Sequence, residues 1–299
     1  MTALRKLKAK VRIAAERVSE RLANRLGFDL VRRGYYSVVP ALEKLDDEVF
    51  ERRSALNGIH FDTREQLRFA TSDLARYFDE LADGRAAPWT PDAISYGAVD
   101  GEVLYGMIRH LRPQRVIELG SGFSTHVLRA AARANRDEGD ASELVTYDPF
   151  PRVDPDTEAG FRVEQLRAQD VPLEAFAELE SGDVLFVDTT HTVTVDSDVN
   201  RIVLDVLPSL ADGVVVHFHD ILLPGEYYRA WFAAGAIWGE QYLLQAFLSM
   251  NPHFEVLWGS AGVRHDHLEE LSALVPSLGD HRPSALWIRK LETSGAPGR

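Results

Sequence analysis

Four short apolar runs of this chain each have an acidic residue at, or directly after, their end. Glu118 lies near the end of the first run, and Asp148 follows residues 143–147. Asp188 and Asp220 follow two further runs, and histidines stand close to both. Carboxylates and imidazoles can transfer protons or hold a divalent cation. Because the ends of parallel strands meet at one edge of a sheet, this spacing predicts a single site.

The histidines suggest two kinds of chemistry at this edge. His191 stands three residues after Asp188, and His219 directly precedes Asp220. A histidine with a pKa near neutral suits general-base catalysis, and we assign that role to His191 first and to His219 second. Alternatively, Asp188, His219 and Asp220 hold Mg²⁺ or another divalent cation. Both alternatives remain open, whereas His217 is expected to tie strand ends together by hydrogen bonding.

A glycine-rich turn follows the first apolar run, with the sequence Glu-Leu-Gly-Ser-Gly-Phe-Ser-Thr over residues 118–125. An apolar strand, such a turn and a helix start together bind nucleotide-like ligands in α/β sheets. The dinucleotide fingerprint needs a third small residue where this chain has Thr125, and the carboxylate of Glu118 suits a cationic ligand instead. The competing explanation is a tight turn that binds nothing. Six residues are the expected ligand contacts: Glu118, Gly120, Ser121, Gly122, Ser124 and Thr125.

Later strand ends extend this binding site. Asp148 follows the turn by about 20 to 30 residues, where an acid can accept hydrogen bonds from both hydroxyls of a ribose. Gln169 and Asp170 follow a third apolar segment, residues 161–168. At this strand end, a polar side chain can recognise the amino group of an adenine. Their alternative role is to cap a helix that begins near Pro172. Asp188 completes the expected cofactor contacts.

The order of these segments predicts an α/β fold. Residues 184–187 are continuously apolar, as expected of a strand buried on both faces. Residues 254–258 and 285–289 supply two final strands. The predicted fold is a Rossmann-like, doubly wound, seven-stranded sheet whose last strand is antiparallel, with an N-terminal helical extension. Four regions are expected: a basic amphipathic helix (1–33), a helical leading segment or cap (34–110), a ligand-binding domain (111–292) and a disordered tail (293–299).

Composition limits the function classes. The chain has 299 residues, of which 45% are hydrophobic, and no cysteine. Disulfides and thiolate metal sites are therefore excluded, and a reducing cytoplasm fits. No apolar run reaches the roughly 18 residues that span a bilayer. Residues 1–33 carry a net charge of +7 in a chain of −13, which leaves −20 for the rest. An acidic body repels nucleic-acid phosphates, so a small-molecule acceptor is favoured.

The basic N-terminal segment and the aromatic residues have several interpretations. Apolar residues recur at helical spacing in residues 1–33, which suits packing on the protein's own body or dimerisation better than membrane contact. A homo-oligomer is left open. The aromatic loop at 221–231 is placed to form an acceptor pocket or lid. Candidate pocket aromatics elsewhere are Tyr35, Tyr36, Trp89 and Tyr96, although each also suits plain packing.

Several longer segments together resemble the family 24 type of bacterial class I methyltransferases that use S-adenosylmethionine (SAM). They are residues 118–125, 147–152, 185–191, 197–200, 216–221 and 240–248. The resemblance extends from about residue 35 to about residue 258. It implies the seven-stranded fold, SAM as methyl donor, and O-methylation of a small hydroxylated acceptor such as a sugar or natural product. The chain departs from many relatives at Thr189 and Thr190, which bears on the geometry of His191.

Two other functions compete with this interpretation. An NAD-dependent oxidoreductase has the same general fold, but Thr125 interrupts the dinucleotide fingerprint. A non-catalytic binding or scaffold protein would instead work through its N-terminal helix.

Overall fold

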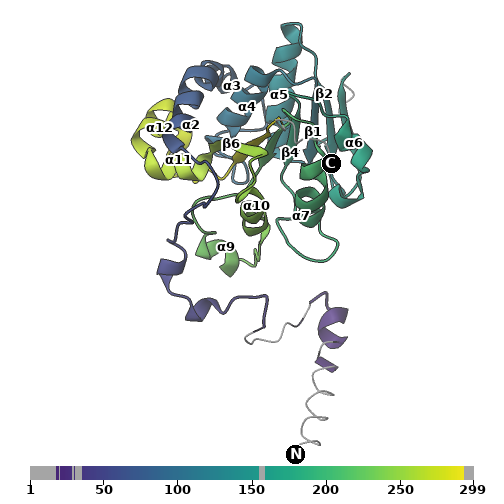
Figure 1. The fold of residues 1–299 in the computed structure, drawn as a ribbon. Coiled ribbons are helices and arrows are strands. Elements are labelled where there is room, and N and C mark those ends of the chain that lie inside the picture. Colours follow the sequence, from purple (N-terminus) through teal and green to yellow (C-terminus); the bar gives the residue numbers. More distant parts are fainter. Residues whose placement is uncertain (1–17, 20, 29, 31–35, 155–158, 293–299) are drawn as a thin grey trace, which may run out of the picture. The chain divides into compact units, whose positions relative to one another are not determined.

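The computed structural model of the chain forms two compact units, Met1–Asp46 and Asp47–Arg299. The second unit contains every strand of the described chain and the candidate site (Figure 1). Among the described residues, no helix combines the length and apolar character that a membrane crossing needs. The structure describes five stretches of the chain: residues 18–19, 21–28, 30, 36–154 and 159–292.

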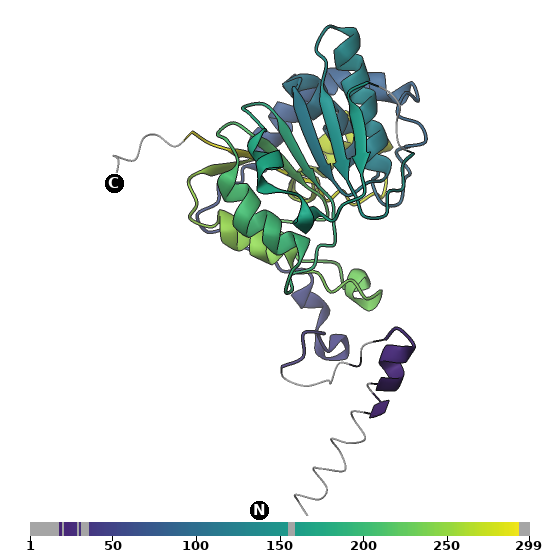
Figure 2. The same ribbon diagram turned by 90° about the vertical axis from the view of Figure 1, so that its right-hand side faces the viewer.

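Seven strands of the second unit form one sheet in the order β3-β2-β1-β4-β5-β7-β6 (Figure 2). Their bounds are β1 Arg115–Leu119, β2 Glu143–Tyr147, β3 Phe161–Glu164, β4 Val184–Val187, β5 Val215–Phe218, β6 Phe254–Gly259 and β7 Leu286–Lys290. β1 to β5 pair in parallel, and β7 runs antiparallel to both β5 and β6. The chain order reverses between β1 and β4, which is where such sheets bind ligands. This topology confirms the predicted Rossmann-like fold.

Helices cover both faces of this sheet (Figures 1 and 2). One face packs against α2 Thr63–Phe69, α3 Phe78–Ala82, α4 Asp100–Leu111, α5 Phe123–Asp137, α11 Ser260–Asp266 and α12 Leu268–Leu274. The other packs against α6 Leu173–Ala177, the continuous segment of α7 Asp198–Arg201, η6 Ile202–Val206 and α8 Leu207–Ser209, and α10 Glu240–Leu248. Shorter elements complete the unit: η2 Asp47–Val49, η3 Ala70–Leu74, η4 Ala75–Tyr77, η5 Ala168–Asp170, α9 Arg229–Ala233 and η7 Pro276–Leu278.

Alternation along β4 shows how the sheet is held between these layers. Val184 and Phe186 enter the core on the α4 and α5 side, whereas Leu185 and Val187 enter the core on the α10 side. All four side chains are buried, as the apolar run predicted. Complete burial of such a side chain contributes about 1.5–3 kcal/mol. The packing on both faces fixes the end of β4, and therefore the position of Asp188.

One strand is shorter than its predicted segment. The apolar residues 161–168 predicted a strand over the whole segment, but β3 ends at Glu164. The Leu166 N–H turns back to donate to the Glu164 carbonyl at 2.9 Å, so the strand cannot continue. Gln169 and Asp170 consequently lie in the short turn η5.

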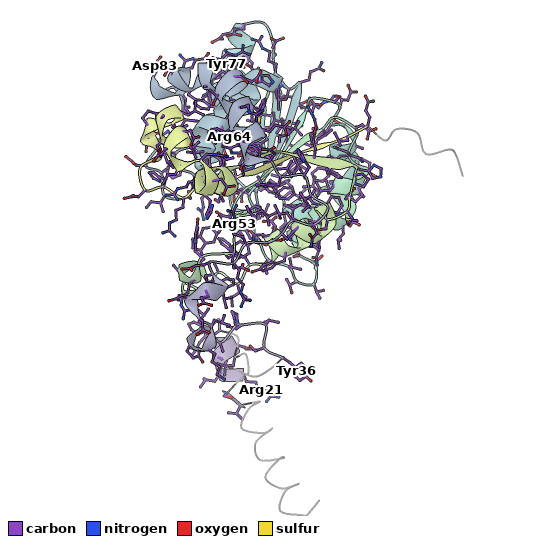
Figure 3. The ribbon with its side chains drawn as sticks, turned by 60° about the vertical axis from the view of Figure 1, so that its left-hand side comes forward. Arg21, Tyr36, Arg53, Arg64, Tyr77 and Asp83 are labelled. Carbon is purple, nitrogen blue, oxygen red and sulfur yellow. The ribbon has the colours of Figure 1, made fainter. Side chains whose placement is uncertain are left out.

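The first unit contains part of the predicted basic helix. Residues 18–19 and 21–25 are helical, and a single turn η1, Leu42–Lys44, follows. Arg21 and Tyr36 of this unit are labelled in Figure 3. The rest of the segment 1–33 lies largely outside the described residues, as does the tail 293–299. The four predicted regions remain predictions.

Candidate functional site

A cavity of about 880 Å³ opens where β1, β2, β4 and β5 end. Its volume lies within the range of small-molecule sites. Of the residues predicted to bind the cofactor or a metal or to act in catalysis, Glu118, Thr125 and Asp170 do not line it. Those that do are Gly120, Ser121, Gly122, Ser124, Asp148, Gln169, Asp188, His191, His219 and Asp220. The sheet thus brings most of the predicted site into one space.

The glycine turn joins β1 to α5 at the floor of this cavity. Gly120 has a φ of +88°, and a Cβ there would lie 1.9 Å from the Asp188 carbonyl oxygen. Only glycine allows so close an approach in that conformation. A Cβ on Gly122 would meet nothing within 4 Å, so this residue borders open space. The turn therefore leaves room for a ligand at the N-terminus of α5, where backbone N–H groups and the helix dipole favour polar ligands.

Glu118 lies beneath the turn and is completely buried. Its carboxylate accepts hydrogen bonds from the hydroxyls of Ser124 at 3.2 Å, Thr125 at 2.9 Å and Thr146 at 2.6 Å. Burial raises the pKa of Glu118 to about 7, although these three hydrogen bonds oppose the rise. The Thr125 hydroxyl also accepts the Gly122 N–H at 3.0 Å. Glu118 and Thr125 therefore support the turn from below.

Asp148 connects the end of β2 to the same turn. Its carboxylate accepts the Ser121 N–H at 2.8 Å, the Ser121 hydroxyl at 2.7 Å and the Phe150 N–H at 2.7 Å. A carboxylate has about four acceptor positions, so Asp148 can still receive a ligand hydroxyl. Gln169 lines the cavity and donates its amide to the Asp196 carbonyl at 3.0 Å. Asp170 instead pairs with Arg167 at 2.6 Å.

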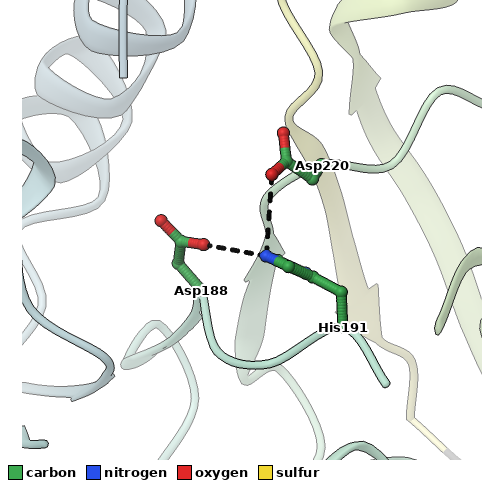
Figure 4. Close-up of side chains that lie close together, drawn as sticks. All are labelled: Asp188, His191 and Asp220. Carbon is green, nitrogen blue, oxygen red and sulfur yellow. Dashed lines mark ion pairs between the residues drawn. The ribbon is translucent and has the colours of Figure 1, made fainter. Parts of the chain in front are cut away.

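Asp188, His191 and Asp220 converge in the same cavity (Figure 4). The Nε2 atom of His191 lies 3.4 Å from an Asp188 oxygen and 3.6 Å from an Asp220 oxygen. One potential ligand atom from each residue lies within 4.8 Å of the other two. His191 and Asp220 have φ values of 56° and 55°. Such left-handed conformations are costly for these residues and are often retained at functional sites.

A buried carboxylate fixes the orientation of His191. The Nδ1 atom of His191 lies 2.7 Å from Oε2 of Glu240, which is 1% exposed at the start of α10. The Gly239 N–H and the Glu240 N–H both donate to the His191 carbonyl, at 3.0 and 3.2 Å. The Trp238 ring lies 4.5 Å from the imidazole, centre to centre. Sequence reasoning missed this role of Glu240, whose only signal is its place at the start of a segment that resembles the family.

Electrostatic interactions determine which groups of this cluster carry a charge. Burial opposes ionisation of Asp188, but the charge of His219 and the hydrogen bond from His191 lower the pKa of this carboxyl to about 2. Burial also opposes a charge on His219, yet Asp220 and Asp188 raise its pKa to about 9. Burial similarly disfavours a charged His191, whose pKa Asp188 and Glu240 nevertheless raise well above the usual value. The histidines thus balance the carboxylates in the absence of other cations.

His219 and His217 pack against aromatic rings behind Asp188 and Asp220. The His219 ring lies tilted against the Tyr96 ring with their centres 4.7 Å apart, and its Nδ1 atom lies 3.5 Å from Asp220. His217 is completely buried, stacks on Phe186 at 4.1 Å and faces the Tyr96 hydroxyl at 3.3 Å. Burial lowers the pKa of His217 well below the usual value. His217 is therefore a neutral packing residue.

Aromatic residues and a threonine shape the remaining walls. Trp231 and Trp238 line the cavity with ring centres 5.0 Å apart. Tyr96 also lines it, whereas Trp89 is buried in the core and donates its indole N–H to the Tyr96 carbonyl at 2.7 Å. Tyr36 belongs to the first unit, and residue 35 lies outside the described residues. The Thr190 hydroxyl donates to the buried carboxylate of Asp198 at 2.6 Å, which anchors the loop that carries His191.

The glycine turn, the acid after β2 and the antiparallel β7 are together typical of Rossmann-like domains, a class that commonly binds nucleoside-containing ligands. Residues 117–221 match the family model described as a methyltransferase domain, and they include both the turn and the Asp188–Asp220 edge. Residues 117–221 therefore form a methyltransferase domain, and the chain is a methyltransferase. This finding confirms the resemblance that the sequence indicated, in place of an oxidoreductase or a non-catalytic scaffold.

Solved structures with similarity to the chain carry related descriptions. A proposed O-methyltransferase from Klebsiella pneumoniae is 13% identical and superposes with a TM-score of 0.37, over 78% of this chain and 97% of that chain. A proposed methyltransferase from Thermobifida fusca is 14% identical, with a TM-score of 0.39, over 80% and 97%. A proposed SAM-dependent methyltransferase from Listeria monocytogenes is 15% identical, with a TM-score of 0.34, over 64% and 96%. No curated protein sequence matches the chain.

Proposed function

We propose that this methyltransferase transfers the methyl group of SAM to a hydroxyl oxygen of a small acceptor, such as a sugar or natural product, with help from a divalent cation. The observation that carries the proposal is the convergence of Asp188, His191 and Asp220 beside the glycine turn. A hydroxyl is a weak nucleophile, and a cation at this position would favour loss of its proton.

The residues around the turn suit SAM. Gly122 borders open space that a side chain would fill, so a ligand can approach the backbone there. Asp148 faces the cavity with remaining acceptor capacity for a ribose hydroxyl. Gln169 lines the same cavity at the end of the third strand region, where it can contact the adenine. In this arrangement the methyl group would point toward the Asp188 edge.

The donor set of the edge suits a hard divalent cation such as Mg²⁺ or Mn²⁺. Asp188 and Asp220 supply carboxylate oxygens, and His191 supplies an imidazole nitrogen. Glu240 holds the other imidazole nitrogen at 2.7 Å, as an outer carboxylate does around many metal-binding histidines. A bound cation would act as a Lewis acid toward the acceptor hydroxyl. We assign His219 to positioning of the two aspartates.

The chain's own residues would contribute alignment and exclusion of water. Methyl transfer is an in-line displacement, and most of its acceleration comes from holding donor and acceptor at near-attack distance. Trp231 and Trp238 offer flat apolar walls next to Asp220, on which a sugar ring can lie. The two indole rings would also displace water from the reacting atoms.

Calorimetric titration with MnCl₂ tests the metal site directly. The wild type is expected to bind one equivalent, and Asp188→Asn is expected to weaken that binding at least about tenfold. Asp205→Asn, which removes an exposed carboxylate paired with Arg201, serves as the matched control. A wild type without Mn²⁺ affinity, with full methyl transfer in EDTA, would disprove the metal. In that case Asp188 and His191 would be tested as a metal-free acid and base pair.

A further inference from the structure

Two further cavities continue from the candidate site on the side of Asp220. The first, of about 310 Å³, shares His219, Asp220 and Trp231 with the cavity of the glycine turn. The second, of about 550 Å³, shares Tyr228 and Arg282 with the first. Because neighbouring cavities share wall residues, the three adjoin one another in a row, and we call the row that runs from the aspartate edge to the outer cavity the path. An acceptor longer than one ring can therefore extend beyond Asp220.

The outer cavity differs in charge from the rest of the protein. Arg52, Arg53, Arg264 and Arg282 line it, and Glu51 and Glu226 are its lining acids, which leaves two more positive than negative charges. Residues 34–299 as a whole carry a net charge of −20. Positive lining is therefore an exception on this acidic body, and it would attract an anion that the remaining surface repels. We call this cavity the arginine cleft.

Besides the exposed Arg52, two of these arginines, Arg264 and Arg282, have no carboxylate partner among the described residues. Arg53, labelled in Figure 3, is paired with Asp266 at 2.8 Å. Arg264 instead donates its Nε–H to the His281 carbonyl at 2.8 Å. The Arg282 guanidinium lies over the Tyr228 ring, 4.9 Å from its centre. In the described part of the chain, the guanidinium groups of Arg264 and Arg282 thus form no ion pair with a carboxylate.

Both unpaired guanidinium groups lie close to Tyr228. Burial raises the pKa of the Tyr228 hydroxyl, and the charges of Arg282 and Arg264 oppose this rise. Tyr228 and Arg282 line both cavities and so lie at their junction, and Arg264 lines the arginine cleft with them. Guanidinium forks bind phosphate oxygens in pairs, and two positive charges match a phosphate dianion better than a single carboxylate.

We propose that the acceptor is a phosphorylated hydroxy compound, such as a sugar phosphate, whose phosphate group binds to Arg264 and Arg282 in the arginine cleft. Its hydroxyl would then lie along the path toward Asp188 and Asp220. This substrate class rests on the proposed function, because only methyl transfer to oxygen makes the hydroxyl an acceptor. The phosphate would give both affinity and orientation, since it binds at the opposite end of the path from the reacting atom.

Calorimetry in EDTA tests the cleft without interference from metal-bound phosphate. The probes are glucose 1-phosphate, glucuronate and methyl glucoside, each added to protein saturated with S-adenosylhomocysteine (SAH). Glucose 1-phosphate is expected to bind at least about tenfold more tightly than the other two probes. The Arg264→Gln and Arg282→Gln double variant is expected to lose this preference. Arg162→Gln, an exposed arginine of β3 at the far edge of the sheet, is the matched control and is expected to keep it.

The SAH titration separates the two proposals. Unchanged SAH affinity in the double variant shows an intact fold, and the single Arg282→Gln variant at the exposed position gives a second measurement. Equal binding of glucose 1-phosphate and methyl glucoside, or a preference for phosphate that survives the double substitution, would refute the cleft. Equal or tighter binding of glucuronate would refute the phosphate assignment. Failure of wild-type protein to bind SAH would instead contradict the proposed function, while the phosphate titration still reports on the cleft.

Discussion

The buried carboxyl of Glu118 predicts that the protein loses stability as pH rises through neutrality. Its pKa is raised from 4.5 to about 7 by burial. The folded state therefore holds a proton over this interval that the unfolded state has released. The contribution to the free energy of unfolding is fully present below pH 4.5 and is lost as pH rises through 7. A difference of about 2.5 pKa units corresponds to about 3 kcal/mol.

The substitution Glu118→Gln isolates this effect. The amide resembles the protonated acid, because its oxygen can accept from Ser124 and Thr125 while its N–H₂ donates to the Thr146 hydroxyl. Denaturant unfolding of both proteins between pH 5 and pH 8 gives the difference in unfolding free energy. Other titrating groups, including the buried Glu102, are common to both proteins and cancel.

We expect the wild type to lose up to about 3 kcal/mol relative to Glu118→Gln as pH rises from 5 to 8. For a unit of this size, that corresponds to a fall in Tm of roughly 6 °C. Glu164→Gln, which changes an exposed carboxylate of β3, is the control and is expected to show no such trend. A pH-independent difference between wild type and Glu118→Gln, or a wild type that gains stability with pH, would refute the reasoning.

Three further predictions concern other residues that hold the site and its supporting layer. Glu240→Gln is expected to weaken Mn²⁺ binding about 10- to 100-fold by calorimetry and to leave SAH affinity unchanged. Gly120→Ala is expected to cost at least about 1–3 kcal/mol in unfolding free energy and to abolish SAH binding, because the added Cβ meets backbone. Gly139→Ala, at a similar φ in open space, is its control. Arg109→Met is expected to cost about 1.5–3 kcal/mol in denaturant unfolding, because it leaves buried Asn135 without its charged partner.

Each of these predictions has a contrary result. Parallel losses of Mn²⁺ and SAH affinity in Glu240→Gln would mean that Glu240 supports the fold rather than the orientation of His191. Equal costs for Gly120→Ala and Gly139→Ala would assign the effect to backbone strain alone. An Arg109→Met protein as stable as the wild type would show that its ion pairs contribute nothing net.

The sequence was informative wherever one local pattern determines the structure. The apolar run 184–187 and its neighbours predicted the order of strands, and the glycine pair predicted the turn, because backbone conformation there depends on nearby residues. Asp188 and Asp220 were predicted to lie together because both follow strands, and their side chains now share contacts with His191.

Features that depend on distant contacts could not be predicted in the same way. Glu240 lies 49 residues from His191 in sequence, and no local pattern connects them. The choice of His191 rather than His219 as the ring between the aspartates depends on a left-handed loop conformation. Glu118 was expected to meet the ligand, but the chain places hydroxyl groups from α5 and β2 around it. Residues of the arginine cleft come from four separate parts of the chain.

Calorimetric titration of the purified protein with SAH tests the central claim most directly. We expect micromolar binding by the wild type and at least about tenfold weaker binding by Asp148→Ala, which removes the acceptor for a ribose hydroxyl. Asp170→Ala, which changes a side chain that pairs with Arg167 but does not itself line the cavity, is expected to bind like the wild type. Absence of SAH binding by the wild type, or equal binding by Asp148→Ala, would contradict the cofactor site described above.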